Sequence, residues 1–574
     1  MNVERLLEVY GQISEAPDAI ARLRRFVLDL AVRGKLVEQD AEDEPASELL
    51  VRIDRERKRL HSLSEIKKPK KLPPIDIAPF DLPSSWVWAR MRDVTSDRGQ
   101  EIPSAQFTYI DVSAIDKEAG VVSDPKVLER DEAPSRARKI ARKGDVIYSC
   151  VRPYLLNVAV ITEDFEPSPI ASTAFAILNG YNLVLPWYLW IALRSPFMVE
   201  CVERDQRGQA YPAINDKDFS LLPLPLPPLT EQHRIVDRVN ELMALCDRLE
   251  EARVAREETR NKLTAASLTR LTAPETSTDE FPAHAQFALD ALPSLTSRPD
   301  QIKSLRQTIL NLAVRGKLVE QDPKDEPASV SLAKIAEARD ADASRKSKRA
   351  RGLPPASDTE ASELPIGWAG VRLSDIAVSM RYGTSTKCGA DTSLVPVLRI
   401  PNVSLGEVTL DDMKFGPLNE REQADLALAA GDLLMIRSNG SLDIVGRSAV
   451  VPIEADGMAF AGYLVRLRTD VKHVNTKYVW MAMNSQLIRD QIEKPIRSAV
   501  GLKNVNLTEF GNLSFWLPPL AEQHRIVAKV DALMTLCDRL EVALTTVGAT
   551  RTRLLEALLH EALEPATGAL EAAE

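Results

Sequence analysis

Hydrophobic residues recur with helical spacing in two long stretches, one in the middle of the chain and one at its end. Each stretch repeats an apolar position every four and three residues, which is the a/d seam of a coiled coil. The seam positions are Ile235, Val239, Leu242, Cys246 and Leu249, and then Ile526, Val530, Leu533, Cys537 and Leu540. From proline-bounded starts, the helices are predicted to reach about Leu271 and Leu559, which is roughly 40 residues or ~60 Å each. We expect the two seams to pack on each other as antiparallel helices, with both cysteines as small core residues.

A shorter amphipathic helix is also predicted twice. Ile20, Leu23, Val27 and Leu30 are spaced by three, four and three positions, and so are Ile302, Leu305, Ile309 and Leu312. Such spacing places apolar side chains on one helical face. Gly34 and Gly316 follow, where a helix favours glycine. The segments beginning at Asp43 and Asp325 predict a second short helix in each half.

These paired elements belong to an internal repeat. Residues 30–40 (LAVRGKLVEQD) recur unchanged as residues 312–322, and residues 231–236 (EQHRIV) recur as residues 522–527. The sequences between the matched blocks are much less alike. Two nearly identical frames therefore carry two different inserts, as expected if one mechanism is applied to two different targets.

The inserts begin near Trp86 and Trp368, the first of which is predicted to fill a core. They contain short β-like runs, at 107–112, 145–148, 159–162 and 174–178, and at 395–400, 432–436, 449–451 and 463–467. Each also has a Gly-Asp turn and a short helix, at 187–192 or 477–482. This composition predicts a mixed α/β plan that both inserts share.

The chain divides accordingly into seven segments. They are an N-terminal helical region (1–50), a basic linker (51–81), a first insert (82–228), a central repeat region with a long helix (229–332), a second basic linker (333–363), a second insert (364–519) and a C-terminal long helix (520–574). We interpret the linkers as solvated; the alternative is that they are flexible arms that contact phosphates.

Composition narrows the class of protein. The 574 residues suggest roughly three to four domains. No apolar run is long enough for a membrane span, the first residues lack a signal-peptide pattern, and the five scattered cysteines indicate reduced thiols in the cytoplasm. The net charge of −10 counts against a nucleic-acid binder that acts alone. It suits a subunit whose partners share the contact with DNA.

Catalytic patterns are missing from the sequence. It contains no GxxxxGK[ST] phosphate loop and no GxGxxG motif, no Cys-x-x-Cys pair and no cluster of histidines. We therefore expect no catalytic residues, no metal site and no cofactor site in this chain.

The duplicated blocks resemble the specificity subunit of type I restriction–modification enzymes. The resemblance rests on the LPPLxEQHRIV segments (226–236 and 517–527) and the LAVRGKLV segments (30–37 and 312–319), and it covers nearly the whole chain. Residues 109–113 and 398–403 also look like strands of that family.

The resemblance implies an α+β fold in which two mixed α/β target-recognition domains are separated by long antiparallel coiled-coil helices, with pseudo-two-fold symmetry. Each domain would read one half of a bipartite, asymmetric site in double-stranded DNA. The helices would fix the distance between the halves and bind two methyltransferase subunits, and a nuclease/translocase subunit would join for restriction. S-adenosylmethionine, ATP and magnesium would belong to those partners. The early repeat block suggests that the N-terminal helix packs beside the C-terminal one, which would make the arrangement circular.

Candidate DNA contacts are polar and basic residues in the inserts. Arg, Asn and Gln suit base edges, whereas Lys and Ser suit phosphates. In the first insert they are Arg136, Arg138, Lys139, Arg142, Lys143, Arg152, Arg204, Arg207, Gln209 and Tyr211; in the second they are Arg437, Ser438, Asn439, Arg447, Arg497, Lys503 and Asn504. The loops before Asn215 and Asn506 are the favoured DNA faces.

Two alternatives stay open at this point. The chain could be a coiled-coil scaffold whose inserts bind protein, or an enzyme with an unrecognised site in an insert. DNA binding with a sequence preference would distinguish recognition from both.

Overall fold

The computed structural model describes residues 15–16, 18–66, 71–208, 210–272, 281–343, 364–404, 406–496 and 503–563. The chain forms two compact units: residues 1–256 with 548–574, and residues 257–547. The boundary falls inside the two long helices, α8 (Leu229–Thr272) and α17 (Leu520–Leu563), which have 44 residues each. Each unit therefore contains one insert and a part of each long helix.

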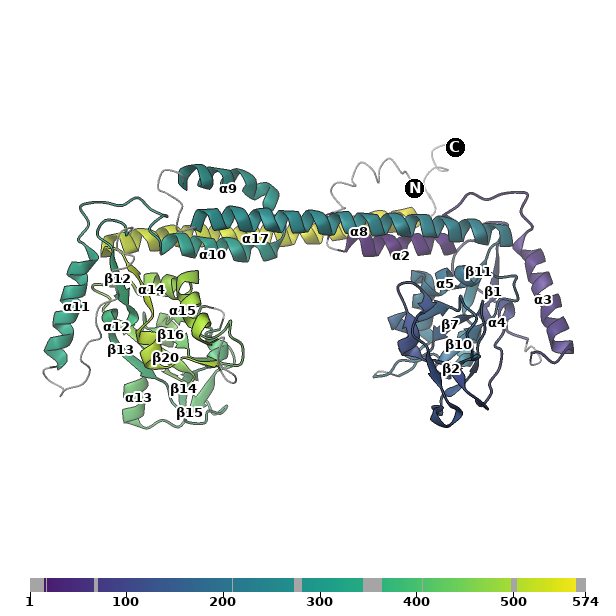
Figure 1. Cartoon of the computed structure of the whole chain (residues 1–574), viewed down its shortest axis with the longest axis horizontal. Coiled ribbons are helices and arrows are strands. Elements are labelled where there is room, and N and C mark those ends of the chain that lie inside the picture. Colours follow the sequence, from purple (N-terminus) through teal and green to yellow (C-terminus); the bar gives the residue numbers. More distant parts are fainter. Residues whose placement is uncertain are drawn as a thin grey trace. The chain divides into compact units, whose positions relative to one another are not determined.

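In the first unit, the short helix α2 (Ala19–Val32) lies along both long helices (Figure 1). Arg24 forms ion pairs of 2.7 Å with Asp247 and Glu250 of α8. Arg253, further along α8, donates to the carbonyl of Ala16, so α2 and α8 run antiparallel.

The C-terminal part of α17 covers another side of α2. Phe26 lies in one hydrophobic cluster with Leu555 and Leu559 of α17, and Arg22 pairs with Glu556. The N-terminal helix thus packs beside the C-terminal one, which confirms the predicted circular arrangement.

The second unit repeats this construction around α10 (Ile302–Ala313). Arg306 pairs with Asp538 at 2.7 Å and with Glu541 at 2.6 Å on α17. Leu312 packs with Leu268 and Leu271 of α8. In each unit the segments of α8 and α17 run in opposite directions, which confirms the predicted antiparallel arrangement of the long helices.

The apolar seams of the long helices are buried within their own units. Ile235 and Val239 join a core with Val27 of α2 and with the first insert. Ile526, Val530 and Cys537 join a core with α10 and the second insert. This packing corrects the expectation that the seams cover each other, because a short helix and an insert supply the apolar partners. Cys246 and Cys537 are buried, as predicted for small core residues.

The first insert contains two main sheets. One has the strand order β10-β7-β8-β4-β3 and the other β5-β2-β9-β6, while β1 pairs with β11 where the insert begins and ends. The strands are β1 Val87–Arg90, β2 Phe107–Ile110, β3 Ile115–Asp116, β4 Val121–Val122, β5 Lys126–Leu128, β6 Ala137–Ile140, β7 Val146–Ser149, β8 Val158–Val160, β9 Pro169–Ser172, β10 Phe175–Leu178 and β11 Pro223–Leu226. The helices are α4 Met91–Val94, α5 Pro186–Arg194, α6 Pro196–Asp205 and α7 Asp216–Ser220.

The second insert follows the same plan with different sheets. Their orders are β13-β20-β16-β18, β15-β14-β19, β17-β21 and β12-β22. The strands are β12 Ala369–Arg372, β13 Ala377–Tyr382, β14 Val395–Leu398, β15 Lys414–Gly416, β16 Leu433–Ile436, β17 Ser438–Asn439, β18 Ser448–Val450, β19 Ala459–Phe460, β20 Leu464–Thr469, β21 Lys503–Asn504 and β22 Ser514–Leu517. The helices are α12 Leu373–Ile376, α13 Glu420–Leu426, α14 Thr476–Met483, α15 Gln486–Ile496 and α16 Leu507–Gly511. The strands that were predicted for each insert are present. The predicted insert helices are present too, as α5 in the first insert and α14 in the second.

The segments predicted as linkers are partly helical. Helix α3 (Ala46–Ser62) continues into the first of them and α11 (Ala328–Ala343) into the second. On α3, Arg57 and Lys58 pair with Asp54, and Arg59 pairs with Glu56. These three cations therefore have carboxylate partners on the same helix. The predicted basic residues at 67, 68 and 70 and at 345–351 lie outside the described residues.

Helix α9 (Phe281–Leu295) was not predicted from the sequence. Its Phe281 packs beside the cluster of Leu268, Leu271 and Leu312. All five cysteines are free thiols. Among the described residues, no helix is both long and apolar enough to cross a membrane.

Candidate nucleic-acid interface

The segment that follows β7 pairs with the loop before α7. Val151 forms a β-bridge with Ala213, and so does Arg207. The backbone N–H of Arg152 donates to the carbonyl of Pro212 at 2.8 Å, and the N–H of Ile214 donates to the carbonyl of Cys150 at 3.0 Å. Two candidate regions that are distant in sequence, around Arg152 and before Asn215, therefore meet at one edge of the insert.

The second insert has the same construction after β16. Strand β17 pairs with β21, in the register Ser438 with Asn504 and Asn439 with Lys503. The N–H of Val505 donates to the carbonyl of Arg437 at 2.8 Å, which matches the bond between Ile214 and Cys150. By this register, Asn439 occupies the place of Arg152.

An asparagine cap ends the loop in both inserts. The side chain of Asn215 accepts hydrogen bonds from Lys217 and Asp218 at the start of α7, and that of Asn506 accepts from Glu509 at the start of α16. Asparagine is favoured at this position because its oxygen satisfies free backbone donors. The two favoured loops therefore end at equivalent, fixed points.

A tyrosine ring supports the guanidinium of Arg152. The guanidinium carbon lies 4.8 Å from the ring centroid of Tyr211, whose side chain is 68% exposed. Arginine is attracted to aromatic faces by a cation–π interaction. Arg152 and Leu156 have φ of 50° and 54° and flank a short helix, Pro153–Leu155, that exposes Tyr154 and Leu155.

Arg437 has a comparable support in the second insert. Its guanidinium carbon lies 4.2 Å from the ring centroid of Tyr382, and its Nε donates to the Oδ1 of Asn504 at 3.1 Å. The hydroxyl of Tyr382 accepts from the backbone N–H of Leu507 at 2.9 Å, so the ring itself is anchored. The exposed Tyr463 is adjacent, because its carbonyl accepts from the N–H of Arg437. Each insert thus presents an arginine held on a tyrosine at the same edge.

The other basic candidates of the first insert are dispersed. Arg136 is exposed and lies near this edge. Its carbonyl accepts a hydrogen bond from the N–H of Thr173, and the carbonyl of the next residue, Ala174, accepts one from the N–H of Cys150. Arg204 and Arg207 are exposed and pair with Asp205 and Asp218. Arg142 and Lys143 precede β7 and therefore lie at its opposite end; Arg138 is half-buried and bonds to the carbonyl of Ser135.

Lys139 is excluded as a DNA contact. It is 4% exposed and its ammonium lies 2.7 Å from Asp97 and 3.7 Å from Asp216. A buried cation requires such partners, so this lysine has a structural role.

Two candidates of the second insert are buried or held by hydrogen bonds within the protein. Ser438 is buried, and Arg447 bonds to the carbonyls of Asp443 and Ser404. Asn439 is half-buried and Asn504 is exposed. Gln209, Arg497 and the side chain of Lys503 lie outside what the structure describes.

Tyr154, Leu155, Tyr382 and Tyr463 belong to these edges but were not predicted. Tyr154 could have been predicted from the sequence, because it lies two residues after the candidate Arg152. Tyr382 is distant from Arg437 in the sequence and reaches it only through the pairing of β13 with β20 and of β20 with β16.

The repeated frame attaches each insert by the same hydrogen bond. The indole Nε1 of Trp86 donates to Glu231 at 2.9 Å, and that of Trp368 donates to Glu522 at 3.0 Å. Burial raises the pKa of both carboxyls, although the indoles oppose this shift. The repeated Glu-Gln-His motif thus joins the start of a long helix to the start of an insert.

A glycine makes room for each attachment. Gly34 has φ of 67°, and a Cβ there would lie 2.3 Å from the Cγ of Pro83. Gly316 has φ of 68°, and its Cβ would lie 2.8 Å from the Cγ of Pro365. The glycines of the repeated block therefore allow the Pro and Trp that begin each insert to pack on the frame. Within the described ranges, no group of three or more metal-ligating side chains is present.

Comparison with known proteins agrees with this architecture. The family described as the type I restriction modification DNA specificity domain matches residues 141–256. The EcoEI specificity subunit of Escherichia coli is 30% identical over 569 residues, covering 95% of this chain and 94% of that protein. The EcoAI specificity subunit of Escherichia coli is 29% identical over 568 residues, with the same coverage of both chains.

A solved chain from work on complex assembly and conformational transition of the type I R-M system has a similar fold. The similarity covers 85% of this chain and 99% of that chain, with a TM-score of 0.50 and 24% identity. This chain therefore belongs to the family of type I restriction enzyme specificity subunits, which provide DNA recognition in type I restriction–modification systems.

Proposed function

We propose that the chain recognises a bipartite, asymmetric site in double-stranded DNA, with one insert reading each half. The observation that carries this proposal is the arginine held on a tyrosine at the same edge of both inserts, Arg152 on Tyr211 and Arg437 on Tyr382. The frames around the inserts are nearly identical while these edges differ. Different side chains at equivalent places are what two different half-sites require.

The supported arginines are the proposed base readers. A guanidinium forms two parallel hydrogen bonds with O6 and N7 of guanine in the major groove. The tyrosine ring limits the rotation of the guanidinium and leaves N–H groups available, which reduces the entropy lost on binding. Among the described residues, Arg437 donates a hydrogen bond only through its Nε, to Asn504, and we propose that its two terminal nitrogens contact a base.

The neighbouring polar side chains have supporting roles in this proposal. Asn439 and Asn504 would contact bases beside the guanine, and Arg136, Arg204 and Arg207 would contact phosphates. Arg142 and Lys143 would reach only a phosphate further along the duplex, because they lie at the other end of β7.

The repeated frames are the proposed docking sites of two identical methyltransferase subunits. A partner bound twice requires its surface to be presented twice, which explains why residues 30–40 and 312–322 are the same. A nuclease/translocase subunit would join this assembly for restriction, and the long helices would set the spacing between the half-sites. S-adenosylmethionine, ATP and magnesium would be held by the partners, and this chain would have no catalytic activity of its own.

Competition binding tests the recognition step. The chain assembled with its methyltransferase subunit is titrated with a labelled duplex that contains the methylated site of the source genome, and unlabelled duplexes compete. We expect specific duplex to compete at least 10³-fold better than unrelated duplex at fixed salt. Equal competition by both would contradict the proposal and favour a protein-binding scaffold.

A further inference from the structure

Exposed apolar side chains gather around Arg152 at one edge of the first insert. Val151 is 42% exposed, Tyr154 is 49% exposed and Leu155 is 41% exposed, and the exposed ring of Tyr211 lies beside the guanidinium. They share one surface, because the segment of Val151 is paired with the loop that carries Tyr211. Neighbouring exposed apolar side chains mark a contact surface, whereas a single one does not. We call these four side chains the apolar edge.

The backbone fixes the direction of the apolar edge. The N–H of Leu155 donates to the carbonyl of Arg152 at 3.0 Å, and the N–H of Leu156 donates to the carbonyl of Pro153 at 2.9 Å. Arg152 and Leu156 both have left-handed backbone, which is costly for residues other than glycine and persists only where the surroundings hold it. The exposed side chains between them, Tyr154 and Leu155, are therefore presented on a backbone that has little freedom to lose on binding.

The second insert has polar residues at the equivalent places. By the register of β17 with β21, Ser438 takes the place of Val151 and is buried. Three positions further on, Ser441 takes the place of Tyr154 and is exposed but polar. Tyr463 is an aromatic residue exposed at that edge, but it precedes β20 and does not follow β17. The two edges therefore differ in chemistry as well as in sequence.

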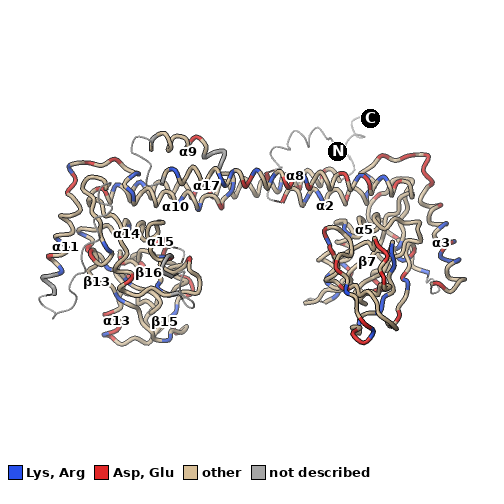
Figure 2. The backbone as a smooth tube through the Cα atoms, viewed as in Figure 1, with Lys and Arg blue, Asp and Glu red and all other residues tan. Residues whose placement is uncertain are grey.

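Charge does not explain the apolar edge. Lys and Arg are interspersed with Asp and Glu along both inserts, so their backbones show no continuous cationic track (Figure 2). Phosphate contacts position a protein on a duplex but carry no base sequence. Apolar side chains gain little from a phosphate, so the partner of the apolar edge is to be sought among the bases.

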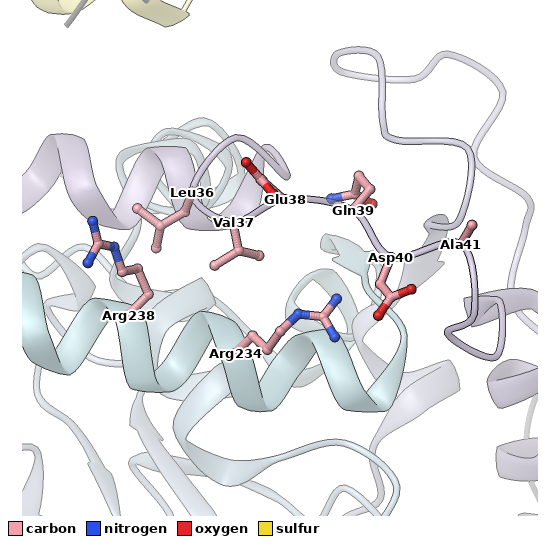
Figure 3. A pocket seen from close by; sticks show the side chains of 8 residues that line it. All are labelled: Leu36, Val37, Glu38, Gln39, Asp40, Ala41, Arg234 and Arg238. Carbon is pink, nitrogen blue, oxygen red and sulfur yellow. The ribbon is translucent and has the colours of Figure 1, made fainter.

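The repeated frame cannot supply the difference between the inserts. It has a groove of about 550 Å³ between residues 36–41 and the start of α8, lined from the helix by Arg234 and Arg238 (Figure 3). Residues 36–40 recur unchanged as residues 318–322. A surface built from a repeated block treats two half-sites alike. Discrimination between the half-sites therefore has to come from unrepeated surfaces such as the apolar edge.

We propose that the apolar edge recognises the C5-methyl group of a thymine beside the guanine that Arg152 reads. This inference rests on the proposed function and assigns a base chemistry to one of its two half-sites. Among the four bases, thymine alone presents a methyl group in the major groove, and apolar side chains contact it favourably. The guanine atoms that an arginine reads lie in the same groove, so one edge can make both contacts. The half-site of the first insert therefore contains at least one A·T pair.

Replacement of thymine by deoxyuridine removes only this methyl group and tests the assignment on the unaltered protein. The chain assembled with its methyltransferase subunit is titrated with the intact site and with duplexes that carry deoxyuridine in one half or the other. The half of the first insert is the one at which Arg152→Ala loses discrimination. There we expect the wild type to lose roughly 4-fold in affinity for each contacted thymine, which is the effect of leaving one methyl group unburied.

A double variant connects this loss to the apolar edge. Tyr154→Ser combined with Leu155→Ser should bind the thymine and deoxyuridine duplexes of that half equally, because the side chains that contact the methyl group are gone. Val127→Ser is the matched control, since Val127 is 54% exposed on β5 of the other sheet, and it should keep the difference. In the other half, deoxyuridine should have the same effect on the wild type and on the double variant. Thermal unfolding of each variant checks that it is folded.

The possible failures are distinguishable. Equal binding of the thymine and deoxyuridine duplexes by the wild type, with its preference over unrelated DNA intact, would overturn the thymine assignment and leave the proposed function. No preference for the site over unrelated DNA would overturn both. If the double variant binds the site more weakly while deoxyuridine has no effect, the apolar edge contacts DNA as a wedge between base pairs and the assignment is wrong. It is also wrong if the folded double variant keeps the difference between thymine and deoxyuridine.

Discussion

The indole Nε1 of Trp86 donates a hydrogen bond of 2.9 Å to the carboxylate of Glu231. The repeat forms the same bond between Trp368 and Glu522, but the two surroundings differ. Glu231 accepts a second bond from Gln39, whereas the Oε1 of Glu522 is buried and has no described hydrogen-bond partner. The carboxylate of Glu522 therefore depends more on its tryptophan for hydrogen bonding than the carboxylate of Glu231 does.

Replacing the tryptophans should reveal this difference. Among the described residues, Trp368 is the one side chain that donates a hydrogen bond to the buried carboxylate of Glu522, so Trp368→Phe should cost about 1–3 kcal/mol or more of folding free energy. Trp86→Phe leaves the bond from Gln39 in place and should cost less. Urea unfolding of both variants measures the order; a larger loss for Trp86→Phe would contradict this account.

The buried Glu522 should make stability depend on pH. Burial raises the pKa of its carboxyl in the folded chain. A raised folded-state pKa favours the protonated form, so its contribution is complete below about 4.3 and is lost as the pH rises through the folded-state value. Glu522→Gln cannot ionise and should therefore gain stability relative to the wild type across that window. Urea midpoints measured from pH 4.5 to 7.5 test the sign, and a constant difference between the two proteins would refute it.

The tyrosine supports should matter for DNA binding through their rings. Tyr382→Phe keeps the aromatic face beneath Arg437 and loses only the bond with Leu507. It should reduce affinity for specific DNA less than Tyr382→Ala, which we expect to weaken binding by about 0.5–2 kcal/mol. Fluorescence anisotropy at fixed salt compares the two variants with the wild-type chain. Equal effects of the Phe and Ala variants would argue against the support role.

Much of the frame could be predicted from the sequence because its signals are local. The apolar spacing of α8 and α17, the glycines at 34 and 316 and the exact repetition of blocks identified the helices and their duplication. The repeat also implied that α2 meets the C-terminal helix. What covers the seams could not be inferred, because the spacing shows that a face is buried and not what buries it.

The candidate DNA edges could be predicted only in part. The loops before Asn215 and Asn506 carried local signals, and the structure shows that they meet the segments after β7 and β16. Tyr382 comes from a distant strand, so its contact with Arg437 depends on the fold. Lys139 looked like a surface cation within a basic run, but its ion pairs with Asp97 and Asp216 are long-range contacts that composition cannot reveal.

The central claim is that the two inserts read different halves of one site, and half-site substitution tests it most directly. Complexes with wild-type chain, Arg152→Ala or Arg437→Ala are titrated with the intact site and with duplexes altered in either half. We predict that Arg152→Ala loses about 1–3 kcal/mol of discrimination, or roughly 5- to 150-fold, at one half only, and that Arg437→Ala loses it at the other half only. Loss at the same half in both variants, or unchanged discrimination in both, would contradict the account.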